Sequence, residues 1–141
     1  MYNSTSLRKG LRVLVVDGNA DSSELLTVLL EGYGVEAIAA TCASDCLEIM
    51  QKSCPDLLIS ELVLPGEDGY SLMSKVKALE TERGTPIPAI ALTVCANKSE
   101  RDQALAAGFC RHLSKPFNID ELLETVACLT RQTQELAMSP Y

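Results

Sequence analysis

The sequence lacks several features that would place it in a functional class at once. Among its 141 residues, 12 basic side chains stand against 19 acidic ones, and the formal net charge is −7. Because a phosphate backbone binds to a basic surface, this balance argues against nucleic acid as a direct partner. No apolar run approaches the roughly 18 residues that cross a bilayer. Residues 1–10 also lack the apolar segment that a signal peptide contains. We therefore expect a cytoplasmic protein without membrane contact.

The cysteines also lack a pattern that would assign them a role. No Cys-x-x-Cys pair occurs, and His112, the only histidine, completes no cluster with the spacing of a zinc site. In a chain without an export signal we expect reduced thiols, several of them small buried apolar groups. A thiol-based redox sensor that uses Cys95 or Cys110 is kept as an alternative function.

Short apolar runs alternate with segments of helical periodicity along the chain. The expected strands are 12–16, 35–40, 57–60, 89–92 and 109–113, and the expected helices are 20–33, 43–53, 70–80, 99–107 and 119–131. In the first helix, Leu25, Leu26, Val28 and Leu29 are expected to form the buried stripe. A single domain over residues 11–131 follows, with a flexible N-terminal segment (1–10) and a flexible C-terminal tail (132–141).

This alternation predicts an α/β fold, a doubly wound five-stranded parallel sheet with helices on both faces. Strands 12–16, 57–60 and 89–92 are the most apolar and belong inside the sheet, because a strand buried on both faces reads as a continuous apolar run. With strands numbered along the chain, the order 2-1-3-4-5 of flavodoxin-like folds satisfies this ranking.

Polar residues stand at the carboxyl ends of four of these strands. Asp17 follows the first strand, Glu61 the third, Thr93 the fourth and Lys115 the fifth. In open parallel sheets, ligands bind just beyond the carboxyl ends of the strands, at the point where the strand order reverses. We therefore expect these side chains to share one site.

The pattern resembles the receiver domain of two-component response regulators over about residues 11–131. The motifs that carry the resemblance are Val15-Val16-Asp17-Gly18-Asn19, Ser60-Glu61-Leu62-Val63-Leu64-Pro65, Leu92-Thr93 and Leu113-Ser114-Lys115-Pro116-Phe117. The resemblance implies a histidine kinase as phosphodonor, Mg²⁺ as cofactor, and a cis bond between Lys115 and Pro116. It also implies that His112 is a rotameric switch, although a merely packed or surface histidine is an equal alternative.

Two departures from the family pattern change what the site can do. Gly18 stands where the family has a second acid that binds Mg²⁺, and Glu61 stands where it has the phosphoacceptor aspartate. The remaining ligands would be Asp17 and the backbone carbonyl of Val63, so we expect weak Mg²⁺ binding, no required cofactor and little phosphorylation. Asp17 would then either mainly hold Lys115 and the first loop or keep a metal-binding role, and the two alternatives are equal. Glu61, reaching toward Thr93 and Lys115, would be a partial mimic of a phosphoryl group or an ordinary strand-end acid.

The resulting hypothesis is a phosphorylation-independent, non-enzymatic interaction module of a two-component phosphorelay. The resemblance implies that a histidine kinase or a downstream effector docks on the face made by the fourth helix, fifth strand and fifth helix. It also leaves room for a homodimer. The main alternative is a working Mg²⁺-dependent phosphoacceptor in which Glu61 or a neighbouring side chain takes the phosphoryl group from a histidine kinase.

Overall fold

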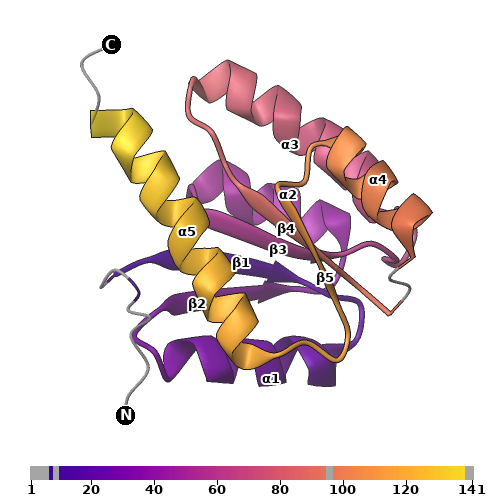
Figure 1. The fold of residues 1–141 in the computed structure, drawn as a ribbon. Helices are drawn as coiled ribbons and strands as arrows, with labels where there is room; N and C mark the ends of the chain where they lie inside the picture. Colours follow the sequence, from indigo (N-terminus) through magenta and orange to yellow (C-terminus); the bar gives the residue numbers. More distant parts are fainter. Residues whose placement is uncertain (1–6, 8–9, 95–96, 139–141) are drawn as a thin grey trace.

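The protein is described by a computed structural model that covers residues 7, 10–94 and 97–138, with side chains covered to residue 130. Strands and helices alternate along this part of the chain (Figure 1). The strands are β1 (Arg12–Val16), β2 (Glu36–Ala40), β3 (Leu57–Glu61), β4 (Ala89–Thr93) and β5 (Arg111–Ser114). The helices are α1 (Ala20–Glu31), α2 (Ala43–Lys52), α3 (Gly69–Arg83), α4 (Lys98–Ala107) and α5 (Ile119–Met138).

The strands form one parallel sheet in the order β2-β1-β3-β4-β5, which confirms the predicted fold class and strand order. The register pairs Val16 with Ser60, Glu61 with Leu92, and Thr93 with Ser114. The strands therefore end at one edge of the sheet, and residues that follow neighbouring strands lie near one another. No helix in the described ranges is long and apolar enough to cross a bilayer.

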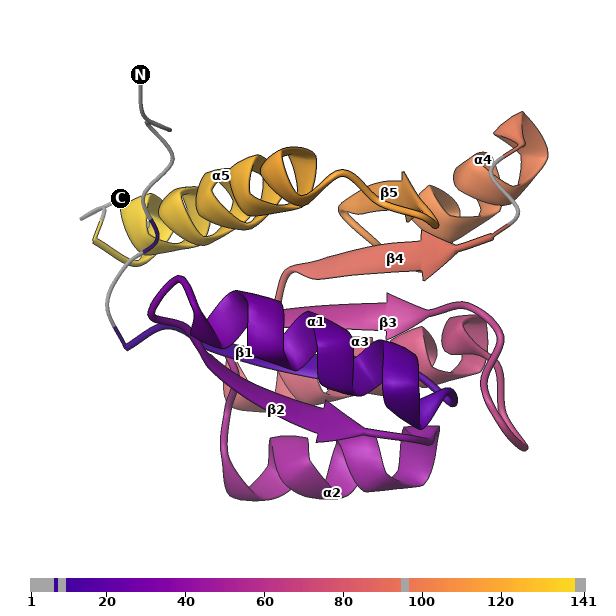
Figure 2. The ribbon, with the colours of Figure 1, turned by 90° about the horizontal axis from the view of Figure 1, so that it is seen from below.

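The core has two layers, one on each face of the sheet. The helices α1 and α5 cover one face of the sheet, and α2, α3 and α4 cover the other (Figures 1 and 2). Their apolar side chains form the two layers. Along β1, Val13 and Val15 point to the first layer, whereas Leu14 and Val16 point to the second. Both faces of the inner strands are thus covered, which is why β1 reads as an uninterrupted apolar run.

The buried stripe of α1 differs from the predicted one. Leu26 and Leu30 are buried, as is Ser23, whereas Leu25 and Val28 are exposed by 60% and 58%. Apolar residues occur on several sides of this helix, but only one side of it faces the sheet. That side carries Leu26 and Leu30, which are four residues apart and therefore lie on the same face of the helix. The prediction that Leu25 and Val28 are buried was therefore wrong, and both are available on the surface.

The last helix is longer than predicted. α5 continues to Met138 instead of ending near Arg131, because residues 132–138 contain neither glycine nor proline and are mostly strong helix formers. Most of the N-terminal segment predicted to be flexible (1–6, 8–9) and residues 139–141 lie outside the described residues, so the division into a domain and flexible ends stays a prediction.

Candidate functional site at the carboxyl edge of the sheet

Three strand ends deliver the charged side chains of the site. Asp17 directly follows β1, and its N–H donates to the carbonyl of Ala40 at the end of β2 (3.1 Å). Glu61 is the last residue of β3. Lys115 directly follows β5, and its N–H donates to the carbonyl of Thr93 at the end of β4 (2.8 Å). The backbone of each of these residues is therefore held in place by the sheet, at the point where its side chain begins.

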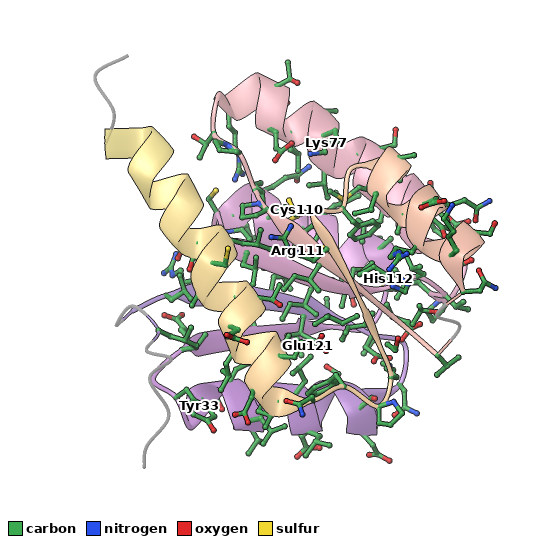
Figure 3. The ribbon with its side chains drawn as sticks, viewed as in Figure 1. Tyr33, Lys77, Cys110, Arg111, His112 and Glu121 are labelled. Carbon is green, nitrogen blue, oxygen red and sulfur yellow. The ribbon has the colours of Figure 1, made fainter. Side chains whose placement is uncertain are left out.

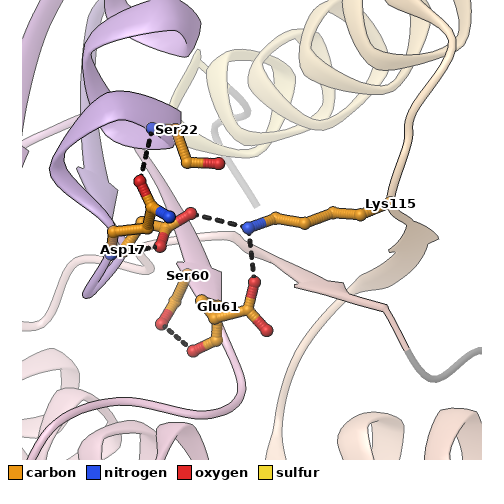
Figure 4. Close-up of polar contacts among 6 residues, drawn as sticks. Asp17, Ser22, Ser60, Glu61 and Lys115 are labelled. Carbon is orange, nitrogen blue, oxygen red and sulfur yellow. Dashed lines mark hydrogen bonds and ion pairs between the residues drawn. The ribbon is translucent and has the colours of Figure 1, made fainter.

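The Lys115 ammonium lies between the two carboxylates (Figure 4). Its Nζ is 2.7 Å from Asp17 Oδ2 and 2.7 Å from Glu61 Oε2. The side chains of Lys115, Asp17 and Glu61 are exposed by 19%, 9% and 11%. We call these three residues the ion cluster. Two negative charges and one positive charge leave it with a formal charge of −1.

The ion cluster keeps Lys115 in its charged form. Burial disfavours the ammonium, but hydrogen bonds to Asp17 and Glu61, supported by their charges, outweigh burial and raise the pKa of Lys115 above its usual value. At neutral pH the amine is therefore fully protonated and can donate to both acids at once. Charge-assisted hydrogen bonds of this kind are stronger than those between neutral groups.

Asp17 also organises the turn between β1 and α1. Its Oδ1 accepts a hydrogen bond from the N–H of Asn19 (2.8 Å), and the Asn19 side chain in turn accepts from the N–H of Ser22 (3.0 Å) as the N-cap of α1. Figure 4 shows these contacts beside the ion cluster. Both carboxylate oxygens of Asp17 are thus hydrogen-bonded to groups of this chain.

The residues do not fit the Mg²⁺ site that receiver domains typically contain. Gly18 has no side-chain donor, and a Cβ placed on it would lie 2.8 Å from Pro65 Cδ and 3.1 Å from Pro65 Cγ. The Pro65 ring therefore occupies the space into which a second acid would project. Mg²⁺ requires near-octahedral oxygen ligands, and within the described residues no group of three or more His, Cys, Asp or Glu side chains could hold a metal ion. Val63 lies two residues beyond Glu61 with an exposed side chain.

Thr93 and His112 lie on β4 and β5, the two strands that follow β3 in the sheet. Thr93 is buried at the end of β4, beside Ser114 of β5. His112 lies within β5, paired with Ala91 of β4. Figure 3 shows it near α4. Its Nε2 is buried without a hydrogen-bond partner in the described part of the chain. The Lys115–Pro116 peptide bond is cis, as predicted.

Two parts of this region could not be picked out from the sequence motifs. One is the contact between Pro65 and Gly18, although the turn rich in Pro and Gly after β3 marked the region. The other is a groove of about 580 Å³ beside Lys115, which Leu25, Val94 and Phe117 help to line. The exposed side of α1, which includes Leu25, forms one wall of this groove, although Leu25 was predicted to be buried.

The structure describes one of the two cysteines considered as redox sensors. Cys110 is half-buried, packs against the core layer under α5, and is labelled in Figure 3. Cys95 lies outside the described residues. Cys46 is fully buried in α2, and this burial, with the nearby Cys42, raises the pKa of its thiol to about 12. A thiol of this kind is a packing group and not a reactive one.

A family model and several known proteins match this chain. Residues 13–127 match the response regulator receiver domain. The "Uncharacterized 14.6 kDa protein in sodA1 3'region" of Leptolyngbya boryana is 37% identical over 114 residues, which are 81% of this chain and 86% of that protein. The sensor histidine kinase GacS of Pseudomonas protegens is 34% identical over 116 residues, which are 82% of this chain but only 13% of the kinase.

A solved structure shows the same fold at lower identity. It is the receiver domain of the Saccharomyces cerevisiae response regulator Ssk1, crystallised with the histidine phosphotransfer protein Ypd1. Its TM-score is 0.80 at 21% identity, and the match covers 88% of this chain and 93% of that one. The fold, the lysine motif and the family match together define a receiver domain of two-component signalling. This chain belongs to the response regulator receiver domain family.

Proposed function

We propose that this receiver domain acts through protein–protein contacts and takes up no phosphoryl group. The observation that carries the proposal is the ion cluster: the Lys115 ammonium contacts Asp17 and Glu61 at 2.7 Å each. Phosphoryl transfer depends on a metal ion and positioned charges for nearly all its catalysis. Here the metal ligand expected at Gly18 is missing, and the acceptor is a longer acid already paired with lysine. The module is therefore not an enzyme and needs no metal ion.

Glu61 supplies part of what a phosphoryl group would supply. A phosphoryl group brings about −1.5 to −2 charges and three acceptor oxygens, whereas Glu61 brings one charge that Lys115 already balances. Moving a two-state equilibrium from 1:99 to 99:1 takes about 5.5 kcal/mol, more than one charge-assisted hydrogen bond of about 1.5–3 kcal/mol provides. Glu61 therefore favours the conformation that a phosphoryl group would stabilise, but it does not shift the domain into that conformation completely.

Phosphodonor treatment tests this function directly. The chain is incubated with acetyl phosphate and Mg²⁺, and its intact mass is compared with that of Glu61→Gln and of a receiver domain that has a phosphoacceptor aspartate. We expect the aspartate-containing receiver to gain one phosphoryl group and this chain to gain none. Stoichiometric labelling that Glu61→Gln abolishes would instead support the Mg²⁺-dependent phosphoacceptor.

The face formed by α4, β5 and α5 is the proposed docking surface. β5 is the edge strand of the sheet, Arg111 is exposed on it, and Leu105 of α4 is 44% exposed. The partners proposed for this surface are histidine kinases, phosphotransfer proteins such as the one crystallised with Ssk1, and effectors. A second copy of this chain is a further candidate.

Self-association is the form of docking that can be measured on the chain alone. Sedimentation over a range of concentrations would show a dimer if one forms through this face. We then expect Leu105→Glu to weaken the dimer several-fold and Val28→Glu, on the exposed side of α1, to leave it unchanged. A dimer that only Val28→Glu weakens would move the docking surface to α1. The absence of any dimer would restrict the face to other proteins.

A further inference from the structure

The ion cluster has the arrangement of a cation held by two acids. The two carboxylates come from the adjacent strand ends of β1 and β3, while the ammonium reaches them from the far edge of the sheet, after β5. All three side chains are at most 19% exposed, so water competes only weakly for these contacts. Carboxylate oxygens are also the kind of ligand that Mg²⁺ and other hard divalent ions prefer.

Groups of this chain already occupy part of the space around the acids. The second oxygen of Asp17 accepts the N–H of Asn19, and the Pro65 ring lies against the backbone of Gly18. A metal ion that bound between the two acids would have to displace the Lys115 ammonium, which would then lose both of its partners. Mg²⁺ would also have to shed water to enter, which it does reluctantly.

We propose that the Lys115 ammonium is the permanent cation of this pocket and takes the place of a divalent metal ion between Asp17 and Glu61. This inference rests on the proposed function, because it gives the reason why the pocket works without metal. Since the charge is covalently attached to the chain, the two acids keep this counter-charge whatever the concentration of divalent ions around the protein.

Neutralising Lys115 should therefore open the pocket to a metal ion. In Lys115→Met, the aliphatic stem remains, but Asp17 and Glu61 lose their counter-charge and repel each other. We expect this variant to bind one Mn²⁺ at least tenfold more tightly than the wild-type chain. Binding is measured as the loss of free Mn²⁺ signal in electron paramagnetic resonance, with no phosphodonor present.

Matched variants locate the bound ion. Glu61→Gln/Lys115→Met should lose the gained site, and Lys115→Arg, which keeps the positive charge, should exclude Mn²⁺ as the wild-type chain does. Lys52→Met removes another lysine paired with an acid, on the exposed side of α2, and should leave Mn²⁺ binding unchanged. Equal binding by the wild-type chain and Lys115→Met, or binding by neither, would overturn the inference.

Folding of the variants is followed by circular dichroism in parallel. If Lys115→Met folds only when Mn²⁺ is added, the inference is supported; if it stays unfolded with Mn²⁺, the inference is overturned. Wild-type binding of one Mn²⁺ that Glu61→Gln abolishes overturns it whether or not the lysine variants fold. Failure of the proposed function is separate, because it is registered as a phosphoryl mass and not as bound Mn²⁺.

Discussion

Gly18 and Pro65 lie so close that a single methyl group between them would overlap the proline ring. A Cβ on Gly18 would come within 2.8 Å of Pro65 Cδ, and the proline ring cannot rotate away as a flexible side chain could. The contact joins the turn after β1 to the loop after β3, next to the ion cluster. The glycine therefore offers no side-chain ligand to a metal ion, and it is the condition for packing these two loops together.

We expect Gly18→Ala to destabilise the protein by about 1–3 kcal/mol, the usual cost of overpacking. Urea unfolding followed by circular dichroism measures the change. Pro65→Ala removes the ring, so the combined Gly18→Ala/Pro65→Ala variant should recover much of the loss. Equal losses for Gly18→Ala in the presence and absence of Pro65 would contradict the contact.

The ion pair between Asp17 and Lys115 should show strong energetic coupling. A double-mutant cycle with Asp17→Asn and Lys115→Met is expected to give a coupling free energy of about 1–3 kcal/mol, because both side chains are largely buried. The exposed pair of Glu48 and Lys52 in α2 is a matched control and should give about 0.3–0.5 kcal/mol. Coupling no larger than that of the control would mean that the cluster contributes only surface electrostatics.

His112 carries a buried nitrogen without a hydrogen-bond partner in the described part of the chain. An unsatisfied buried polar atom costs free energy, whereas an apolar ring of similar shape does not. We therefore expect His112→Phe to leave the free energy of unfolding unchanged or to raise it by about 1 kcal/mol. Chemical denaturation at neutral pH tests this expectation. A loss of stability of more than about 2 kcal/mol would show that the imidazole makes a contact that the structure does not describe.

Alkaline pH should destabilise the protein through Cys46. Its thiol has a pKa of about 12 in the folded chain, against 9.0 for an ordinary cysteine. Because the folded-state pKa is the higher one, the stabilisation is complete below pH 9.0 and is lost as pH rises toward 12. Between about pH 8 and about pH 10.5 we expect a loss on the order of 2 kcal/mol from this group.

Cys46→Ala separates this thiol from other alkaline effects, including deprotonation of Lys115. The variant should be somewhat less stable near neutral pH, since it leaves a small cavity, but its urea midpoint should fall less steeply with pH. Parallel pH profiles for the two proteins would show that another group causes the alkaline loss.

Much of the fold follows from the sequence because its strongest signals are local. The apolar runs of β1, β3 and β4 are continuous, and once their order is set, parallel strands must end at one edge. That geometry is enough to bring Asp17, Glu61 and Lys115 together. The stripe of α1 was not predictable, because Leu25 and Leu26 are both apolar and periodicity cannot say which of them faces the sheet. The contact of Gly18 with Pro65 depends on how two loops approach each other in space, which residue spacing does not encode.

The three strand ends that build the ion cluster are made at different times during synthesis. Asp17 and Glu61 leave the ribosome well before Lys115, which lies 98 positions after Asp17. Until the fifth strand has been translated, the two acids have no counter-charge from this cluster. We therefore expect a released chain truncated before residue 111 to be cleaved faster in limited proteolysis than the full chain, and equal cleavage would argue that the first four strands settle without the lysine.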